Sequence, residues 1–281
     1  MLEIGVKNHK GEFLAFSRDP RYEVIASGIS PAGATVCMSK TAMNDGAKYN
    51  SSRVDERNIV LTVYIMRDAE EARANLYRYF PPKRKCALYF KNGARDVCID
   101  GYVETLECDL YEMGQQAQIS ILCPDPYFQS VSGVSVEVGK LLPLFEFPFA
   151  IEKEGVELSQ LYSDAVGAVL NEGDAESGMA MELFASGKVV NPRIYNTQTR
   201  QNIGLAMEML QGDVVTINTH VGEKSVTLLR GGVKSNIINR LMGRPDWLRL
   251  ETGNNTFTYK CQAGDENLHV TFRFRPRYMG V

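Results

Sequence analysis

Hydrophobic and polar residues alternate along much of the chain, most regularly between Val97 and Cys123. Successive side chains of a β-strand point to opposite faces, so two alternating runs here predict two strands, each with one buried face. The predicted buried positions are Val97, Ile99, Gly101, Val103, Ala117, Ile119, Ile121 and Cys123. Pro124 and Pro126 follow, and because proline cannot donate to a β-ladder, we expect the second strand to end there.

The segment before these strands predicts one more strand and a helix. Ile59–Ile65 is the most apolar strand-like run of the chain. Asp68 is a favourable N-cap residue, and Glu71 stands three positions later, which is the spacing of a capping box. Apolar residues then recur at helical spacing up to Phe80, and Pro81 ends the pattern. We expect this amphipathic helix to cover one face of the sheet.

The second half of the chain reads almost entirely as strands. Short alternating runs are separated at regular intervals by turn residues, such as the glycine and asparagines of Gly253–Asn255. This pattern is typical of an antiparallel β-sandwich. The fold is therefore predicted to be mainly β, with one domain at residues 1–130 and a second at residues 131–281.

The longest polar stretch of the first half is Lys40–Arg57, which contains the turn signal Asn44–Gly46. Two interpretations are open. The stretch is either an ordinary surface loop, which is the more common case, or an arm that becomes ordered only against a neighbouring molecule.

Composition excludes several classes of protein. Of the 281 residues, 44% are hydrophobic and 23% are charged, and the formal net charge is -3, which is typical of globular proteins. The charge is neither basic enough for a specific nucleic-acid partner nor acidic enough for a disordered tail. We expect no membrane-spanning stretch and no signal peptide.

The sequence offers little chemistry for an active site. The six cysteines form no CxxC pair and there are only three histidines, so free thiols in a reducing compartment are expected instead of a metal site. No nucleophile elbow and no histidine relay is evident. We therefore predict no catalytic residue, no cofactor and no metal, and a chain that is not an enzyme.

Trp247 is the single tryptophan, within the segment PDWLRLETGNNTF. An aromatic ring on a β-sandwich can stack against the apolar face of a sugar, or it can fill the edge of a core. The neighbouring Leu248 and Leu250 favour the core interpretation.

An ordered set of sequence blocks runs along nearly the whole chain. In the first half these blocks are YNSSRVDERNIVLTVYI, DAEEARANLYRYFPP, DGYVETLECDL and QAQISILCPDPYF, and in the second half NPRIYNTQTRQN, GDVVTINT, PDWLRLETGNNTFTY and VTFRFRPRYMGV. Together they resemble the distal tail protein (Dit) family of long-tailed bacteriophages. The order of the blocks, with CPDPYF closing the first domain, carries the resemblance.

The resemblance implies a structural role in the virion, at the phage tail tip, after assembly in the host cytoplasm. It implies a homo-hexameric ring that joins the tail tube protein to a tail-tip hub or lysin and carries receptor-binding proteins. The N-terminal domain would be a β-sandwich-like unit with one helix, and the C-terminal domain a galectin-like β-sandwich.

Within this resemblance, the stretch Lys40–Arg57 is the candidate inter-subunit arm. Its candidate contact residues are Asn50, Arg53, Asp55 and Arg57. The alternative function, in a different class, is a carbohydrate-binding module that engages the host cell wall, with Trp247 as the sugar-stacking residue.

Overall fold

The computed structural model describes residues 2–40, 45–109, 114–138, 141–143, 159–161 and 166–281. Internal contacts divide the chain into two units, one made of Met1–Ser132 with Arg277–Val281 and the other of Gly133–Pro276. The division into domains 1–130 and 131–281 stays a prediction. In the structure the last five residues, which that division assigned to the second domain, pack with the first unit.

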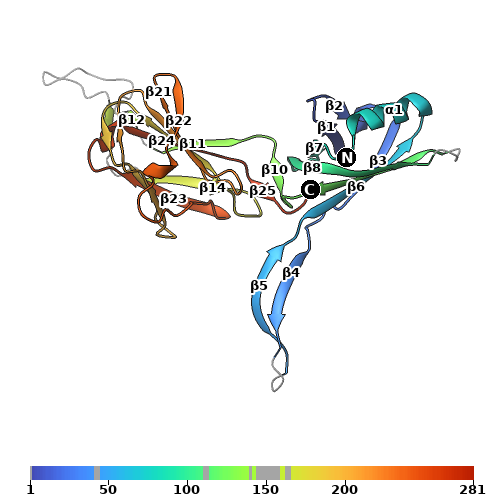
Figure 1. Ribbon diagram of the computed structural model, residues 1–281, viewed down its shortest axis with the longest axis horizontal. Helices are drawn as coiled ribbons and strands as arrows, with labels where there is room; N and C mark the ends of the chain where they lie inside the picture. Colours follow the sequence, from blue (N-terminus) through green and yellow to red (C-terminus); the bar gives the residue numbers. More distant parts are fainter. Residues whose placement is uncertain (1, 41–44, 110–113, 139–140, 144–158, 162–165) are drawn as a thin grey trace, which may run out of the picture. The chain divides into compact units, whose positions relative to one another are not determined.

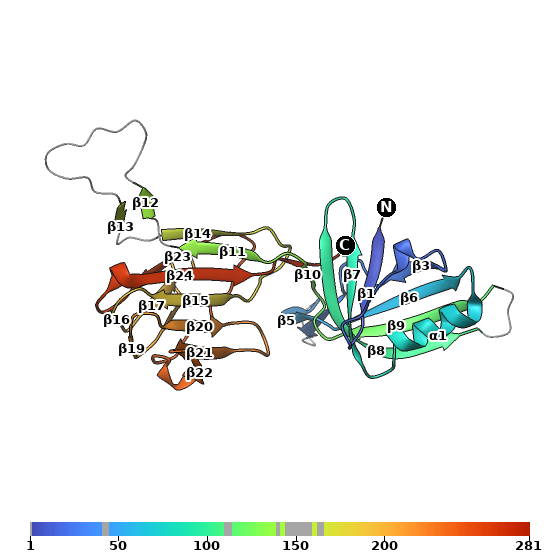
Figure 2. The same ribbon diagram turned by 90° about the horizontal axis from the view of Figure 1, so that it is seen from above.

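The first unit is built around an antiparallel sheet with strand order β2-β1-β7-β8-β9-β6-β3, in which β10 also pairs with β8 and β25 pairs with β10 (Figures 1 and 2). A separate two-stranded sheet pairs β4 with β5. The elements are β1 (Glu3–Lys7), β2 (Phe13–Ala15), η1 (Phe16–Arg18), β3 (Tyr22–Ser27), β4 (Ala34–Ser39), β5 (Lys48–Val54), β6 (Arg57–Ile65), α1 (Ala69–Tyr79), β7 (Lys85–Lys91), β8 (Asp96–Cys108), β9 (Gln116–Cys123), β10 (Phe128–Ser130) and β25 (Arg277–Tyr278).

The two strands predicted between Val97 and Cys123 are β8 and β9, and β9 ends at Cys123, directly before Pro124. All eight predicted positions on their inner faces are buried. The register sets Ile121 opposite both Ile59 of β6 and Val103 of β8, so three strands contribute to one apolar layer. Side-chain alternation therefore identified the centre of this sheet correctly.

Helix α1 lies on one side of the sheet (Figure 1) and buries Ala72 and Leu76 against it. The Tyr22 hydroxyl donates to the Ala72 carbonyl oxygen at 2.9 Å, which fixes the helix to β3. The predicted capping box is wrong. Asp68 occupies the N-cap position, but its backbone is left-handed, with φ of 50°, and its side chain makes no capping hydrogen bond.

The second unit contains a six-stranded sheet, β11-β24-β15-β20-β21-β22, and a four-stranded sheet, β14-β23-β17-β18. Phe272 of β24 stacks on Phe257 of β23 with ring centroids 4.7 Å apart, which joins the two sheets in one core. The elements are β11 (Val134–Val138), β12 (Leu141–Pro143), β13 (Ser159–Leu161), β14 (Val166–Asn171), β15 (Ala180–Ala185), β16 (Val189–Val190), β17 (Arg193–Asn196), β18 (Asn202–Gly204), β19 (Glu208–Met209), β20 (Val214–Asn218), β21 (Ser225–Arg230), β22 (Val233–Asn236), η2 (Ile238–Arg240), β23 (Gly253–Lys260), η3 (Asp265–Asn267) and β24 (Leu268–Phe274).

The described residues thus form antiparallel sheets with a single α-helix, and the predicted mainly β class is confirmed. The galectin-like character of the second unit stays a prediction. Among these residues, no helix combines the length and the apolar composition that a membrane crossing requires.

Candidate functional site

Strands β4 and β5 form a hairpin that projects from the first unit (Figure 1). Every residue of both strands is exposed. We call residues 34–54 the arm; residues 41–44 within it lie outside the described part of the chain. A two-stranded ribbon alone in water is only marginally stable. The arm therefore has the form of an element that gains its stability from a partner.

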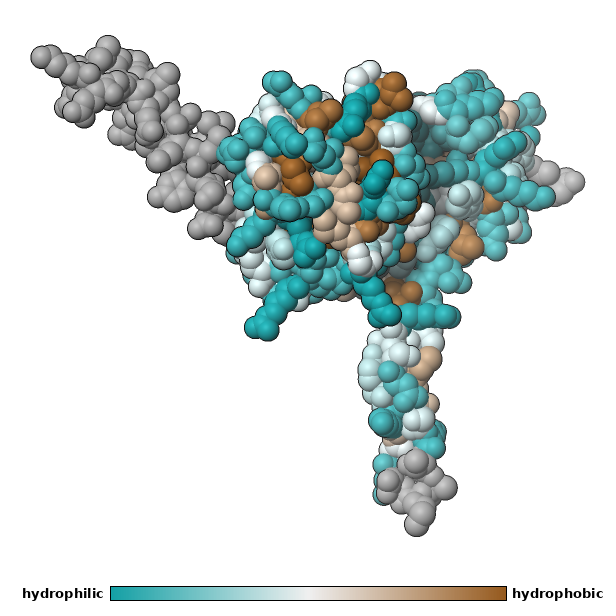
Figure 3. All heavy atoms as spheres, turned by 60° about the vertical axis from the view of Figure 1, so that its left-hand side comes forward, coloured by the Kyte–Doolittle hydropathy of each residue, from teal (hydrophilic) through white to brown (hydrophobic). Residues whose placement is uncertain are grey.

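The two faces of the arm differ in character. Directly paired residues of an antiparallel ribbon share a face, and the register pairs Val36 with Ser52 and Met38 with Tyr49. One face therefore carries the apolar residues Ala34, Val36, Met38, Tyr49 and Val54 together with Ser52, and the other carries Thr35, Cys37, Ser39, Lys48, Ser51 and Arg53. Met38 and Tyr49 are 60% and 59% exposed. In Figure 3, hydrophobic residues are interspersed with hydrophilic ones along the arm.

The four predicted arm residues occupy different environments. Asn50 is the extra residue of a β-bulge opposite the Cys37–Met38 step. Arg53 lies on the polar face and forms an ion pair with Asp55 at 3.0 Å, and hydrogen bonds from Thr35 and Arg53 hold the pKa of Asp55 below its usual value. Asn50 and Arg53 are therefore available to a partner, and Asp55 braces the root of the arm. Arg57 is buried in β6.

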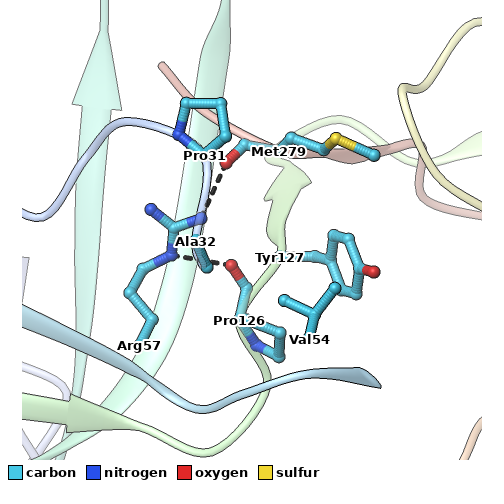
Figure 4. A pocket seen from close by; sticks show the side chains of 7 residues that line it. All are labelled: Pro31, Ala32, Val54, Arg57, Pro126, Tyr127 and Met279. Atoms are coloured by element: carbon cyan, nitrogen blue, oxygen red, sulfur yellow. Dashed lines mark hydrogen bonds between the residues drawn. The ribbon is translucent and has the colours of Figure 1, made fainter. Parts of the chain in front are cut away.

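Arg57 connects separate segments at the root of the arm. Its guanidinium donates to the carbonyl oxygens of Pro126 at 2.7 Å, Gly28 at 2.6 Å and Met279 at 2.7 Å, and also to that of Ser30. Figure 4 shows the side chain between Pro126 and Met279. Arg57 is 4% exposed, and within the described residues no carboxylate pairs with it.

Burial lowers the pKa of the Arg57 guanidinium, which stays charged because the usual value is so high. Carbonyl dipoles and the face of the Phe128 ring, 4.7 Å from the guanidinium carbon, take the place of an anionic partner. Such a buried cation is held only while its acceptors remain in place. Arg57 is therefore a structural anchor of the arm and not a contact residue on its surface.

A hollow of about 220 Å³ of solvent-open space lies beside Arg57 (Figure 4). It is lined by Pro31, Ala32, Val54, Arg57, Pro126, Tyr127 and Met279. Its size is below the usual range for a small-molecule pocket, and Arg57 already directs its donors to backbone oxygens. The hollow lies where the root of the arm packs against the C-terminal segment.

Comparisons with known proteins found one family model that matches part of the chain. Residues 172–278 match the family model described as siphovirus-type tail component, C-terminal domain, of the SPP1 Dit type. The match covers 107 of the 281 residues, and the matched family is one of siphovirus-type tail components.

Solved structures extend the likeness to the whole fold of the chain. The crystal structure of the SPP1 Dit protein aligns with a TM-score of 0.70 at 12% identity, covering 99% of both chains. The activated baseplate of phage P2, solved with Ca and with Sr, aligns in each case with a TM-score of 0.52 at 12% identity, covering 98% of both chains. Comparison with curated proteins gave no match. At this identity the structural likeness concerns the fold.

The sugar-stacking residue predicted for the alternative function is half-buried. Trp247 packs at the edge of the second unit's core, and the Lys224 ammonium lies 5.2 Å from its ring centroid. One side of the ring thus contacts the core and a cation lies over it. Carbohydrate binding through Trp247 stays a prediction without geometric support.

Two arginines hold the C-terminal segment. Arg277 forms an ion pair with Asp125 at 2.5 Å, and Arg95 donates to the Gly280 carbonyl oxygen at 2.6 Å. No local pattern predicts either contact, because the partners are more than 150 residues away in the chain. Within the described residues, no group of three or more histidine, cysteine, aspartate or glutamate side chains could hold a metal ion.

Thiol labelling will distinguish the arm from the core. Cys37 is exposed on the arm, whereas burial raises the pKa of both Cys86 and Cys123 to about 12. Because the thiolate is the reactive form, at pH 8 we expect Cys37 to react at least about 100-fold faster than either buried thiol. Peptide mapping after timed labelling measures this, and equal rates in the folded chain would contradict the structure.

Proposed function

We propose that six copies of this chain form a closed ring at the distal end of a phage tail. The ring would join the tail tube protein to a tail-tip hub or lysin and carry receptor-binding proteins, after assembly in the host cytoplasm. The observation that carries the proposal is the fully exposed arm with one apolar face. The match of residues 172–278 to a siphovirus-type tail component supports the tail location.

The arm is compatible with a ring for a geometric reason. A projecting hairpin and the surface that receives it are different surfaces of the same chain, so copies can associate head-to-tail. Head-to-tail contacts close into a ring when the rotation between neighbours allows it. Exposed apolar residues at the centre of such a contact supply the binding energy, while the polar face stays solvated.

A matched pair of arm variants tests this function. Met38→Asp places a charge on the apolar face, and Ser51→Asp places the same charge on the polar face of the adjoining strand. We expect the wild-type chain to sediment as a hexamer at high concentration and Met38→Asp to weaken association about 30-fold or more, since a central contact is worth about 2 kcal/mol. Ser51→Asp should associate like wild type.

Two outcomes would contradict parts of the proposal. A wild-type chain that stays monomeric at every accessible concentration, together with a tail tip that lacks the protein, would overturn the ring. If Ser51→Asp blocked association and Met38→Asp did not, the ring would stand but the apolar face would not be its contact surface. Thiol accessibility of Cys37 in the assembled state gives an independent measure of which face is covered.

A further inference from the structure

The first unit is completed by residues 277–281. The chain leaves this unit at Ser132 and re-enters it at Arg277, and β25 then pairs with β10, with Tyr278 opposite Phe128. Phe128 is fully buried, and Tyr278 packs against the same core. The first 132 residues thus contain the arm and the sheet but lack one strand of the finished unit.

Arginines from three places hold this C-terminal segment. Arg277 pairs with Asp125 and lies 4.3 Å from the centroid of the Tyr127 ring. Arg95 donates to the Gly280 carbonyl oxygen and lies 4.6 Å from the centroid of the Tyr278 ring. Charge-assisted hydrogen bonds of this kind are among the stronger polar contacts in proteins. The segment is therefore fixed at both ends.

The same segment contacts the root of the arm. Arg57 joins the Met279 carbonyl oxygen to that of Gly28, in the connection between β3 and the arm. The Val281 amide donates to the Ile29 carbonyl oxygen of that connection at 3.2 Å. On the other strand, only two residues separate Val54 of β5 from Arg57. Both strands of the arm thus reach a junction that the C-terminal segment closes.

Without the C-terminal segment, this junction would be a hinge between the sheet and the arm. Gly28 has φ of +79°, and a side chain there would lie 2.1 Å from the Asn58 carbonyl oxygen, so the chain turns out of the sheet at a point that only glycine permits. Beyond it, the Asp55 amide makes only a long hydrogen bond, 3.4 Å, to the Gly33 carbonyl oxygen. The hydrogen bonds between β4 and β5 do not fix the arm relative to the sheet, so contacts from the C-terminal segment provide this restraint.

We infer that residues 277–281 act as a latch that sets the direction of the arm and so makes the chain competent for self-association. Fixing the arm before association removes the entropy cost of ordering it in the contact. The association half of this inference rests on the proposed ring; the arm-setting half concerns the single chain.

Removal of the latch tests the single-chain half. A chain ending at Pro276 should exchange amide hydrogens about tenfold faster in residues 28–34 and 48–55, while β6, β8 and β9 and the second unit stay within about twofold of wild type. Met279→Ala keeps the carbonyl oxygen that Arg57 binds and should behave like wild type. The Arg95→Gln, Arg277→Gln double variant loosens the latch without shortening the chain and should reproduce the truncation.

The outcomes are separable from those of the ring test. Wild-type exchange at the arm root in the truncated chain would overturn the latch, as would a loss of protection spread evenly through the first unit in both loosened chains. These measurements use dilute, unassociated chain, so they stand even if no ring forms. With a wild-type ring in hand, sedimentation of the truncated chain should show at least tenfold weaker association, and unchanged association would remove the link between latch and assembly.

Discussion

Replacing Arg57 by methionine will lower the free energy of unfolding of the first unit by about 3 kcal/mol. Methionine fills much of the same volume but cannot donate, so it leaves the carbonyl oxygens of Gly28, Pro126 and Met279 without the donors that they have now. A fully buried acceptor without a partner costs roughly 1–3 kcal/mol, and these three hydrogen bonds are partly buried, so each contributes toward the lower end of that range. Removing the buried charge of Arg57 also ends its desolvation cost, which offsets part of the free energy lost with these hydrogen bonds.

The measurement needs a probe of the first unit alone. Hydrogen exchange of buried amides in β6 and β9 reports its unfolding, while fluorescence of Trp247, in the second unit, serves as an internal reference that should not change. Arg53→Met is the matched control: its side chain is 79% exposed, so the same substitution should change stability by less than about 0.5 kcal/mol. Equal effects of the two substitutions would show that Arg57 is not an anchor.

Local patterns predicted the sheet well because its strands bury one face within their own unit. Alternation at Val97–Cys123 corresponds to buried inner positions in β8 and β9. In the arm, the same kind of pattern has another meaning. Val36 and Met38 alternate with Thr35 and Cys37 like a half-buried strand, yet all are exposed. Sequence period shows that a face is apolar, but it does not show which molecule covers that face.

The predicted arm, Lys40–Arg57, starts and ends later in the chain than the arm of the structure, residues 34–54, because the prediction followed the polar residues. Polarity marked the second strand and the turn, while the first strand, β4, begins at Ala34 and reads as an ordinary core strand. At the other end, Arg57 looked like one more exposed charge. Its acceptors include the Met279 carbonyl oxygen, 222 residues away, and no local pattern encodes a partner at that separation.

The capping box failed at Asp68 because local propensity competes with the path of the chain. Strand β6 ends at Ile65, and three residues must redirect the backbone into α1. A left-handed residue at the N-cap makes that turn, and the Asp68 side chain then makes no capping bond. Aspartate tolerates the left-handed region better than most residues. This tolerance explains the presence of Asp68 at the position without any capping role.

Phe272→Ala will destabilise the second unit by about 4 kcal/mol, the largest effect that we expect from a single truncation in this chain. Phe272 is 1% exposed and stacks on Phe257 between the six-stranded and four-stranded sheets. Removing its ring leaves a cavity at the contact that joins the two sheets, and the flanking strands β11 and β15 are fixed by their ladders and cannot close it.

Trp247 fluorescence during urea unfolding measures this loss, because the indole packs against the same core and becomes exposed when the core opens. Phe184→Ala is the control of identical chemistry: Phe184 lies in β15 of the same sheet but is 40% exposed on the outer face, so its removal should cost less than about 1 kcal/mol. The ratio of the two losses tests the sandwich directly. If Phe184→Ala cost as much as Phe272→Ala, the six-stranded sheet would bury its other face, and the assignment of core and surface in the second unit would be wrong.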